Sequence, residues 1–244
     1  MRLAEKVAMV TGGGAGIGRA IVLALAREGA DILVADIQLG AAEAVAKEVR
    51  DCGRRAAAIP VDVTQEAQVQ RAIADGIRQF GRIDILVNNA GVIPGIGHRF
   101  TRQTEADWDR VYNVNVKSIF FTCKAIAPHF IERKSGKIIN IASIAGPLAS
   151  PTMPSYSVSK MGAITFTRIL AKELAAYNVN VNAICPGLLW TDMWKGIGEV
   201  LRATNPAYRD LTPRQMFEKR VEEWVPLKRE QTPEDIGSAA VFLA

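Results

Sequence analysis

The sequence predicts an α/β fold in which a parallel sheet carries helices on both faces. Short apolar runs rich in Val, Ile, Leu and Ala alternate with longer helical patterns from the start of the chain. A glycine-rich segment stands between the first run and the first helical pattern, and no linker, repeat or low-complexity tract interrupts the alternation. Strands separated by helices need crossover connections, which are typical of parallel sheets. We therefore expect one domain over residues 1–244.

The first third of the chain predicts four strands, over residues 7–10, 32–35, 57–61 and 83–87. Helical patterns at 18–28, 40–51 and 65–80 separate them. Gly53 ends the second of these helices, and Asp62 and Thr64 form a start signal for the third. Pro60 weakens the third strand, because proline cannot donate a hydrogen bond to a neighbouring strand.

The rest of the chain continues the alternation and then departs from it. Residues 104–133 predict a long helix with a late kink or break at Pro128. A strand at 137–141, a helix at 155–177 and a strand at 179–184 follow. The stretch 188–227 is an insertion of the length that lids and binding loops have. It carries aromatic and methionine side chains that either pack on the core or also form a pocket wall: Trp190, Met193, Trp194, Leu201, Met216, Phe217 and Trp224.

Composition excludes several classes of function. The chain has 49% hydrophobic residues and a net charge of +5 with no basic run, which argues against nucleic-acid binding. Cys52, Cys123 and Cys185 are odd in number and far apart, and His98 and His129 lack ligand spacing, so we expect no disulfide framework and no metal site. Charged residues near the N-terminus and the lack of a long apolar run predict a cytoplasmic protein with no signal peptide and no membrane span.

The glycine-rich segment Thr11–Gly18 predicts a dinucleotide site. It follows a strand and opens a helix, the context that such a site requires. Gly12, Gly16 and Gly18 allow a tight turn, close approach of the backbone to a pyrophosphate and close helix packing. The helix N-terminus adds free N–H groups and a positive dipole end. The alternative is a glycine turn without a ligand.

Asp36 closes the second predicted strand and bears on the choice of cofactor. A carboxylate there can bind both hydroxyls of an adenosine ribose and repels a 2′-phosphate. No lysine or arginine stands at positions 13–15 or at Ile37 to attract that phosphate. The sequence therefore predicts NAD rather than NADP, unless Asp36 only faces solvent.

Tyr156 and Lys160 lie four residues apart in a predicted helix, so their side chains share one face. A neighbouring ammonium favours a phenolate and lowers the pKa of a tyrosine. A phenol tuned in this way exchanges a proton with an alcohol or a carbonyl at neutral pH. Core packing for Tyr156 and a solvated helix position for Lys160 are the alternatives.

With these residues the sequence resembles the short-chain dehydrogenase/reductase family over nearly all its length, which implies a Rossmann-type, doubly wound fold with a helical substrate lid. Thr11–Gly18 resembles its glycine motif, and 88–91 resembles its Asn-Asn-Ala-Gly motif beside the cofactor. The resemblance implies a catalytic tetrad of Asn115, Ser143, Tyr156 and Lys160. Tyr156 would be the acid/base, Ser143 would bond the substrate oxygen, Lys160 would lower the pKa of the tyrosine and grip the nicotinamide ribose, and Asn115 would hold a relay water. Ser143 as a turn residue and Asn115 as a helix residue bonding backbone stay open.

The resemblance also implies which residues contact the cofactor. Asp62-Val63 resembles the pair beside the adenine, and Pro186-Gly187 with Thr191 resembles the segment that holds the carboxamide. The expected NAD contacts are Gly12, Gly14, Ala15, Gly16, Ile17, Gly18, Asp36, Ile37, Asp62, Val63, Asn89, Ala90, Gly91, Tyr156, Lys160, Pro186, Gly187, Leu189 and Thr191. The resemblance also implies a homo-oligomer, a tetramer or a dimer. Family members usually continue past Ala244 into a last strand that contributes to subunit packing, so we expect that this sequence is cut short; the alternative is an exposed sheet edge.

The substrate is expected to be a small ketone or secondary alcohol. The expected pocket wall is mostly apolar, which favours a neutral or moderately hydrophobic molecule: Val92, Ile93, Pro94, Ile144, Ala145, Met153, Leu188, Trp190, Met193 and Trp194. The lid resembles that of members acting on diols, polyols or hydroxyketones. Alternatives are a 3-oxoacyl-[acyl-carrier-protein] reductase, against which Asp36 and the lid length count, and a hydroxysteroid-type dehydrogenase. A non-catalytic nucleotide sensor would usually have lost Tyr156 or Lys160, and a methyltransferase gives no reason for that pair.

Overall fold

A computed structural model gives the structure of the chain and describes residues 1–95 and 97–244. Six parallel strands form one sheet in the order β3-β2-β1-β4-β5-β6. The strands are β1 (Val7–Thr11), β2 (Asp31–Asp36), β3 (Ala56–Pro60), β4 (Ile85–Asn88), β5 (Gly136–Ile141) and β6 (Val179–Ile184). The predicted parallel sheet is therefore confirmed. Pro60 is tolerated because it closes β3, which lies at the edge of the sheet.

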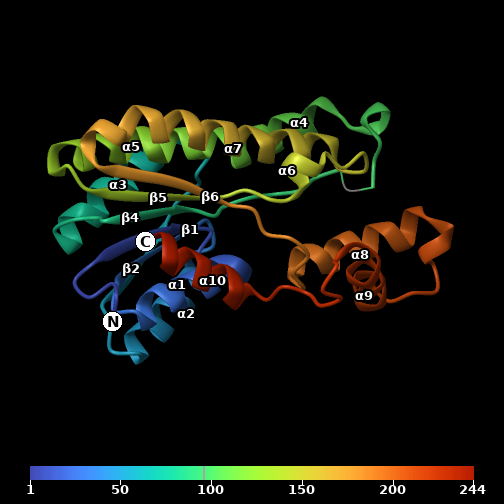
Figure 1. Ribbon diagram of the computed structural model, residues 1–244, viewed down its shortest axis with the longest axis horizontal. Coiled ribbons are helices and arrows are strands. Elements are labelled where there is room, and N and C mark those ends of the chain that lie inside the picture. Colours follow the sequence, from blue (N-terminus) through green and yellow to red (C-terminus); the bar gives the residue numbers. More distant parts are fainter. Residues whose placement is uncertain (96) are drawn as a thin grey trace.

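Helices cover both faces of the sheet (Figure 1). On one face lie α1 (Gly16–Arg27), α2 (Leu39–Asp51) and α10 (Pro233–Leu243), and on the other lie α3 (Glu66–Phe80), α5 (Ser118–Arg133) and α7 (Pro154–Leu174). Alternate residues of each strand point to opposite faces, so Ala8 and Val10 join one apolar core and Val7 and Met9 join the other. No helix in the described ranges is long and apolar enough to cross a membrane.

The predicted helix 104–133 is divided at a different place from the one expected. It consists of α4 (Glu105–Tyr112), a π-helical segment η2 (Asn113–Lys117) and α5, and α5 continues through Pro128 to Arg133. The predicted break at Pro128 is therefore wrong. Pro128 is exposed, and its neighbours Ile126 and Phe130 are fully buried, which keeps this stretch packed on the sheet. The irregular turn contains Asn115 instead, and such π-helical turns are frequent at functional sites.

The stretch after β6 forms the expected helical lid beside the sheet (Figure 1). It consists of α8 (Asp192–Thr204), a 3₁₀ turn η4 (Pro206–Tyr208) and α9 (Pro213–Trp224). The lid has a small core of its own, in which Trp190 and Trp194 pack on the buried ring of Phe217. A parallel bridge between Leu189 and Gln231 closes its base. The remaining short elements are η1 (Phe100–Arg102), α6 (Ala145–Leu148) and η3 (Ala175–Tyr177).

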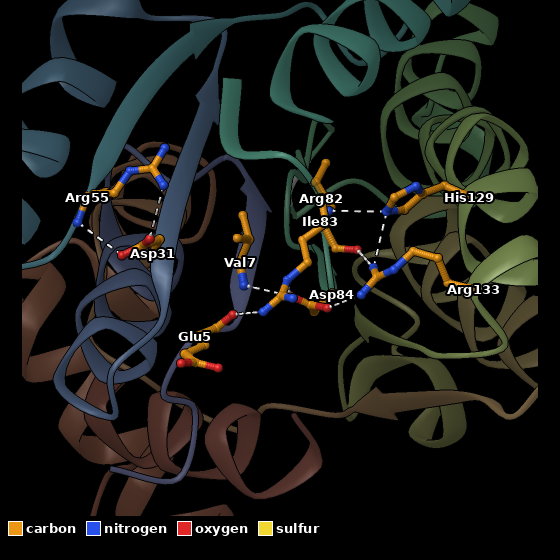
Figure 2. Close-up of polar contacts among 9 residues, drawn as sticks. All are labelled: Glu5, Val7, Asp31, Arg55, Arg82, Ile83, Asp84, His129 and Arg133. Atoms are coloured by element: carbon orange, nitrogen blue, oxygen red, sulfur yellow. Dashed lines mark hydrogen bonds and ion pairs between the residues drawn. The ribbon is translucent and has the colours of Figure 1, made fainter. Parts of the chain in front are cut away.

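A polar network fastens the amino end of the sheet (Figure 2). Asp84 accepts hydrogen bonds from Val7 N at 2.9 Å, Arg82 Nε at 3.0 Å and Arg133 Nη2 at 2.6 Å. Burial by itself would raise the pKa of Asp84, but these donors offset it and hold the pKa below its ordinary value. The network joins β1 to β4 and to the end of α5. It lies at the amino edge of the sheet, opposite to the carboxyl edge.

Candidate active site

The residues predicted for the site gather at the carboxyl edge of the sheet. Parallel strands end at the same edge, which is where open α/β sheets bind ligands. A cavity of about 400 Å³ opens there between the sheet and the lid. The predicted residues that line it are Gly12, Ala15, Gly16, Ile17, Gly18, Asn89, Ala90, Gly91, Ser143, Tyr156, Lys160, Pro186, Gly187, Leu189 and Thr191. The fold thus brings together segments that are far apart in the sequence.

The loop between β1 and α1 requires its glycines. Gly12 and Gly16 have φ angles of +61° and +52°, in the left-handed region that favours glycine. A Cβ on Gly18 would stand 2.0 Å from the carbonyl oxygen of Gly12. Asn89 holds the loop in place, since its Nδ2 donates to the carbonyl oxygens of Gly12 at 2.9 Å and Thr11 at 3.1 Å. A residue that is distant in the sequence therefore stabilises the conformation of the loop.

The start of α1 fits a dinucleotide. Ala15 at the N-cap provides no side-chain hydrogen bond to the first turn of the helix, and Ala15 to Gly18 line the cavity. An N-terminus without a side-chain cap offers N–H groups and the positive end of the helix dipole to an anion. The pyrophosphate of a nicotinamide dinucleotide has the charge and the oxygen acceptors that this surface suits. The glycine cradle and the helix end are thus consistent with the predicted cofactor.

Asp36 lies at the end of β2, beside the glycine loop. Its Oδ2 accepts a hydrogen bond from Gly14 N at 2.9 Å, and its Oδ1 accepts one from Gln38 N at 3.0 Å. Ile37 is 67% exposed, so no neighbouring side chain encloses this end of the strand. These two backbone hydrogen bonds fix the position of the negative charge of Asp36.

Five of the predicted cofactor residues lie outside the cavity wall. They follow β1, β2 and β3 at the same edge of the sheet: Gly14, Asp36, Ile37, Asp62 and Val63. Asp62 Oδ1 accepts hydrogen bonds from Thr64 N at 2.9 Å and Thr64 Oγ1 at 2.7 Å, which shapes the turn into α3. Asp62 therefore has a local structural role, and its contact with the adenine stays a prediction.

Tyr156, Lys160 and Ser143 meet in the cavity. Tyr156 and Lys160 lie one turn apart on α7, with Lys160 Nζ 5.6 Å from the centre of the tyrosine ring. Ser143, which follows β5, lines the same cavity, and its side chain lies close enough to Tyr156 to lower the pKa of the phenol in part. Lys160 Nζ donates to the carbonyl oxygen of Ile141 at 2.8 Å.

The expected lowering of the pKa of Tyr156 is wrong for the chain by itself. Burial raises the pKa of Tyr156 to about 12, and the nearby Ser143 side chain offsets this only in part. Burial also lowers the pKa of Lys160 to about 8, and the nearby Cys185 offsets this only slightly. Enclosure by protein thus outweighs the attraction between the two groups, and Tyr156 is a protonated phenol at neutral pH.

The side chain of Asn115 bonds backbone, one of the two interpretations left open by the sequence. Its Oδ1 accepts from Val92 N at 2.9 Å, and its Nδ2 donates to Val92 O at 3.0 Å and to Ser159 Oγ at 3.0 Å. Asn115 is 1% exposed and lies outside the cavity wall. It ties the segment after β4 to α7, the helix that carries Tyr156.

The substrate side of the cavity is mostly apolar, as expected, but its members differ in part. Seven of the expected residues line it: Ile93, Ile144, Ala145, Met153, Leu188, Met193 and Trp194. Val92, Pro94 and Trp190 are not in the wall, and the expectation for them is wrong. Trp190 instead packs in the core of the lid against Phe217.

Leu201 and Trp224 of the lid also line the cavity, one of the two alternatives given for them, whereas sequence reasoning missed Leu148, Thr152, Ile197 and Arg220. Two of these pairs, Ile197 with Leu201 and Arg220 with Trp224, have the four-residue spacing of one helix face. That spacing is the signal that would have placed them on a common surface. It does not say which surface faces the cavity.

The structure offers no metal centre within the residues that it describes, where no group of three or more His, Cys, Asp or Glu side chains could hold an ion. Cys52, Cys123 and Cys185 are free thiols. Burial raises the pKa of the Cys123 thiol to about 12, so it behaves as a small apolar side chain.

Comparisons with known proteins agree with this geometry. A family model described as "short chain dehydrogenase" matches residues 6–201. The 3-oxoacyl-[acyl-carrier-protein] reductase FabG of Thermotoga maritima is 34% identical over 244 residues, which are all of this chain and 92% of that protein. Among solved structures, NAD⁺-bound xylitol dehydrogenase matches with a TM-score of 0.93 and 34% identity, covering 100% of this chain and 93% of the other. Levodione reductase matches with a TM-score of 0.91 and 30% identity, covering 99% and 91%.

Proposed function

The chain belongs to the short-chain dehydrogenase family, and from that premise we propose that it interconverts a secondary alcohol and a ketone by hydride transfer with NAD(H). One observation carries the proposal: Ser143, Tyr156 and Lys160 line the same cavity as the glycine loop, with Lys160 Nζ 5.6 Å from the centre of the tyrosine ring. A bound nicotinamide supplies the hydride donor or acceptor. The protein has to orient the substrate carbon and manage the charge on its oxygen.

In the direction of ketone reduction, Tyr156 donates its phenolic proton to the substrate oxygen while the carbonyl carbon receives the hydride. A pKa of about 12 keeps Tyr156 protonated at neutral pH, so it is ready to act as the acid. Ser143 provides a second hydrogen bond to the same oxygen. Lys160 is 4% exposed, and its ammonium near the tyrosine ring stabilises the phenolate that forms. A proton from solvent then restores Tyr156.

The preference for NAD is part of the proposal. Asp36 is held by Gly14 N and Gln38 N at the end of β2, where its charge would repel a 2′-phosphate. Ile37 provides no positive charge nearby. The NAD⁺-bound state of the similar xylitol dehydrogenase supports the same preference.

A diol, polyol or hydroxyketone is the substrate class that we propose first. The name of the similar xylitol dehydrogenase supports a polyol. A 3-oxoacyl-[acyl-carrier-protein] reductase is the second candidate, because the Thermotoga maritima relative of that name matches the whole chain at 34% identity. Turnover of NADH with acetoin, xylulose and an acetoacetyl thioester distinguishes the two candidates.

Tyr156→Phe tests the mechanism, because it keeps the ring and removes the proton. We expect a loss in kcat of about 10²- to 10⁴-fold, the usual contribution of a general acid. Binding of NADH, followed by its fluorescence, should change little, since the ring and Lys160 remain. Tyr177→Phe, an exposed tyrosine beyond α7, is the matched control. Wild-type turnover in Tyr156→Phe would refute the role given to Tyr156.

We also propose that the chain forms a homo-oligomer in the cytoplasm. Large apolar side chains are exposed on α4, α5 and α7, which lie together on one side of the molecule (Figure 1): Trp108, Tyr112, Phe120, Val158, Met161 and Ile169. Phe120 of α5 meets Phe166 of α7 with 6.4 Å between ring centres, so the two helices present one surface. A surface of this kind is typical of a protein–protein contact. The three free thiols support a reducing compartment.

A further inference from the structure

Arg220 introduces a positive charge into the mostly apolar lid side of the cavity. It lies on α9 and lines the cavity together with Trp224, one turn further along the helix. Its guanidinium carbon is 4.5 Å from the centre of the Trp224 ring and 5.9 Å from that of Tyr208. Its Nη2 donates to Tyr208 Oη at 3.2 Å. Two rings and one hydrogen bond therefore hold the guanidinium in place, and most of its N–H donors are left for another partner.

Among the residues that the structure describes, Arg220 forms no ion pair. Arg214 on the same helix is a useful contrast, because its guanidinium is bonded to Glu218 at 2.8 Å and to both oxygens of Glu230 at 3.0 Å. Asp192, the acidic residue of the lid that lines the cavity, is paired with Lys195 at 2.7 Å. The charge of Arg220 is thus left without a counterion from the lid.

A partly buried cation beside apolar side chains is unfavourable unless an anion pairs with it. The planar fork of arginine matches the two oxygens of a carboxylate or of a phosphate. Ile197 and Leu201 of α8 also line the cavity, so an apolar stretch of substrate has a surface to contact.

We propose that Arg220 binds an oxyanion on the substrate, a carboxylate in the first place, at the lid side of the cavity. The reacting oxygen lies at Ser143 and Tyr156, and a short apolar segment connects the two ends of the molecule. This inference rests on the proposed function and narrows it to keto or hydroxy compounds that carry a negative charge. It differs from the neutral substrate expected from the sequence, because the sequence does not show which side chains surround Arg220.

The test compares charged and uncharged forms of the same ketone. Levulinate and its methyl ester are assayed with NADH, and dihydroxyacetone phosphate and dihydroxyacetone form a second pair that separates phosphate from carboxylate recognition. We expect kcat/KM in the wild type to favour levulinate over its ester by about tenfold to a hundredfold, the usual effect of a hydrogen-bonded charge. Arg220→Met should bring that ratio near one, and Arg220→Lys should keep part of it.

Lys219→Met is the matched control, because it removes one positive charge from the position directly before Arg220 on α9, and Lys219 does not line the cavity. It should leave the ratio at the wild-type value. An unchanged ratio in Arg220→Met, or a wild type that prefers the uncharged member of both pairs, overturns the proposal. If the wild type prefers only dihydroxyacetone phosphate over dihydroxyacetone, the oxyanion site is supported, but its ligand is a phosphate rather than a carboxylate.

Calorimetry of levulinate binding, with and without NAD, separates this inference from the proposed reaction. If no ketone is turned over but levulinate binds and Arg220→Met weakens its binding tenfold or more, the oxyanion site stands and the proposed reaction falls. If ketones are turned over and levulinate binds equally to both proteins, the reaction stands and the oxyanion site falls. Melting temperatures of the variants show whether each is folded.

Discussion

Replacing Asp36 by asparagine should shift the cofactor preference from NAD toward NADP. The carboxylate is held by backbone N–H groups of Gly14 and Gln38, at 2.9 and 3.0 Å, so its position is defined. Asparagine has nearly the same shape and keeps one oxygen acceptor, but it removes the negative charge. The change therefore removes the charge and also one of the two backbone hydrogen bonds, because the amide nitrogen of asparagine cannot accept a hydrogen bond.

The size of the effect follows from the exposure of Asp36, which is intermediate between buried and exposed. Two unit charges about 4 Å apart repel by about 1 kcal/mol in water and about 4 kcal/mol at the dielectric typical of a protein surface. This range corresponds to a change of about fivefold to about a thousandfold in relative affinity. Asp36→Asn should lower the ratio of kcat/KM for NAD to that for NADP by a factor in this range, and adding Ile37→Arg should lower it further.

The assay measures initial rates with each cofactor at a fixed alcohol concentration, and calorimetry gives the two dissociation constants. Asp51→Asn removes a similar charge from the exposed end of α2, where it is paired with Lys47, and serves as the control. The electrostatic argument is refuted if the wild type uses both cofactors equally well. It is refuted equally if Asp36→Asn and Asp51→Asn give the same ratio.

Two further predictions concern the whole protein. Burial first, and then the charge of Arg133, lower the pKa of His129 below its ordinary value of 6.5 (Figure 2), so the unfolded chain binds more protons than the folded one below about pH 6.5. The contribution of neutral His129 to the free energy of unfolding is therefore complete above that pH and is lost as the pH falls. The lowered pKa of Asp84 causes a further loss of stability below about pH 3.8. Urea unfolding at several pH values should show a step near pH 6.5 that His129→Gln removes, and a step of equal size in that variant would contradict the assignment. Phe120→Asp with Ile169→Asp should reduce the oligomer to a smaller species in analytical ultracentrifugation, whereas Leu227→Asp, at a more exposed leucine beyond α9, should not. Identical sedimentation of the wild type and both variants would contradict the proposed contact surface.

The strands and the glycine loop were predictable because their signals are local. A run such as Val7–Thr11 is buried on both faces and therefore reads as continuously apolar. The glycine loop is recognisable because Gly12 and Gly16 require positive φ and Gly18 has no room for a Cβ. The four-residue spacing of Tyr156 and Lys160 is likewise enough to place both side chains on one face of a helix.

Other features depended on residues that are distant in the sequence. Pro128 predicts a break, but burial of Ile126 and Phe130 against the sheet holds α5 through it. The irregular turn at Asn115 has no local sequence signal, because its side chain is satisfied by Val92 and Ser159 from other segments.

The amino-acid sequence by itself determined the parallel sheet, its glycine cradle and the pairing of Tyr156 with Lys160, because each follows from backbone sterics or helical periodicity over a few residues. Only the tertiary structure decided how those groups are charged and what shares their cavity. Burial raises the pKa of Tyr156 to about 12, and the fold brings Arg220 to the cavity wall without an ion pair among the residues that the structure describes. Both are effects of the surrounding protein, which no single stretch of sequence contains.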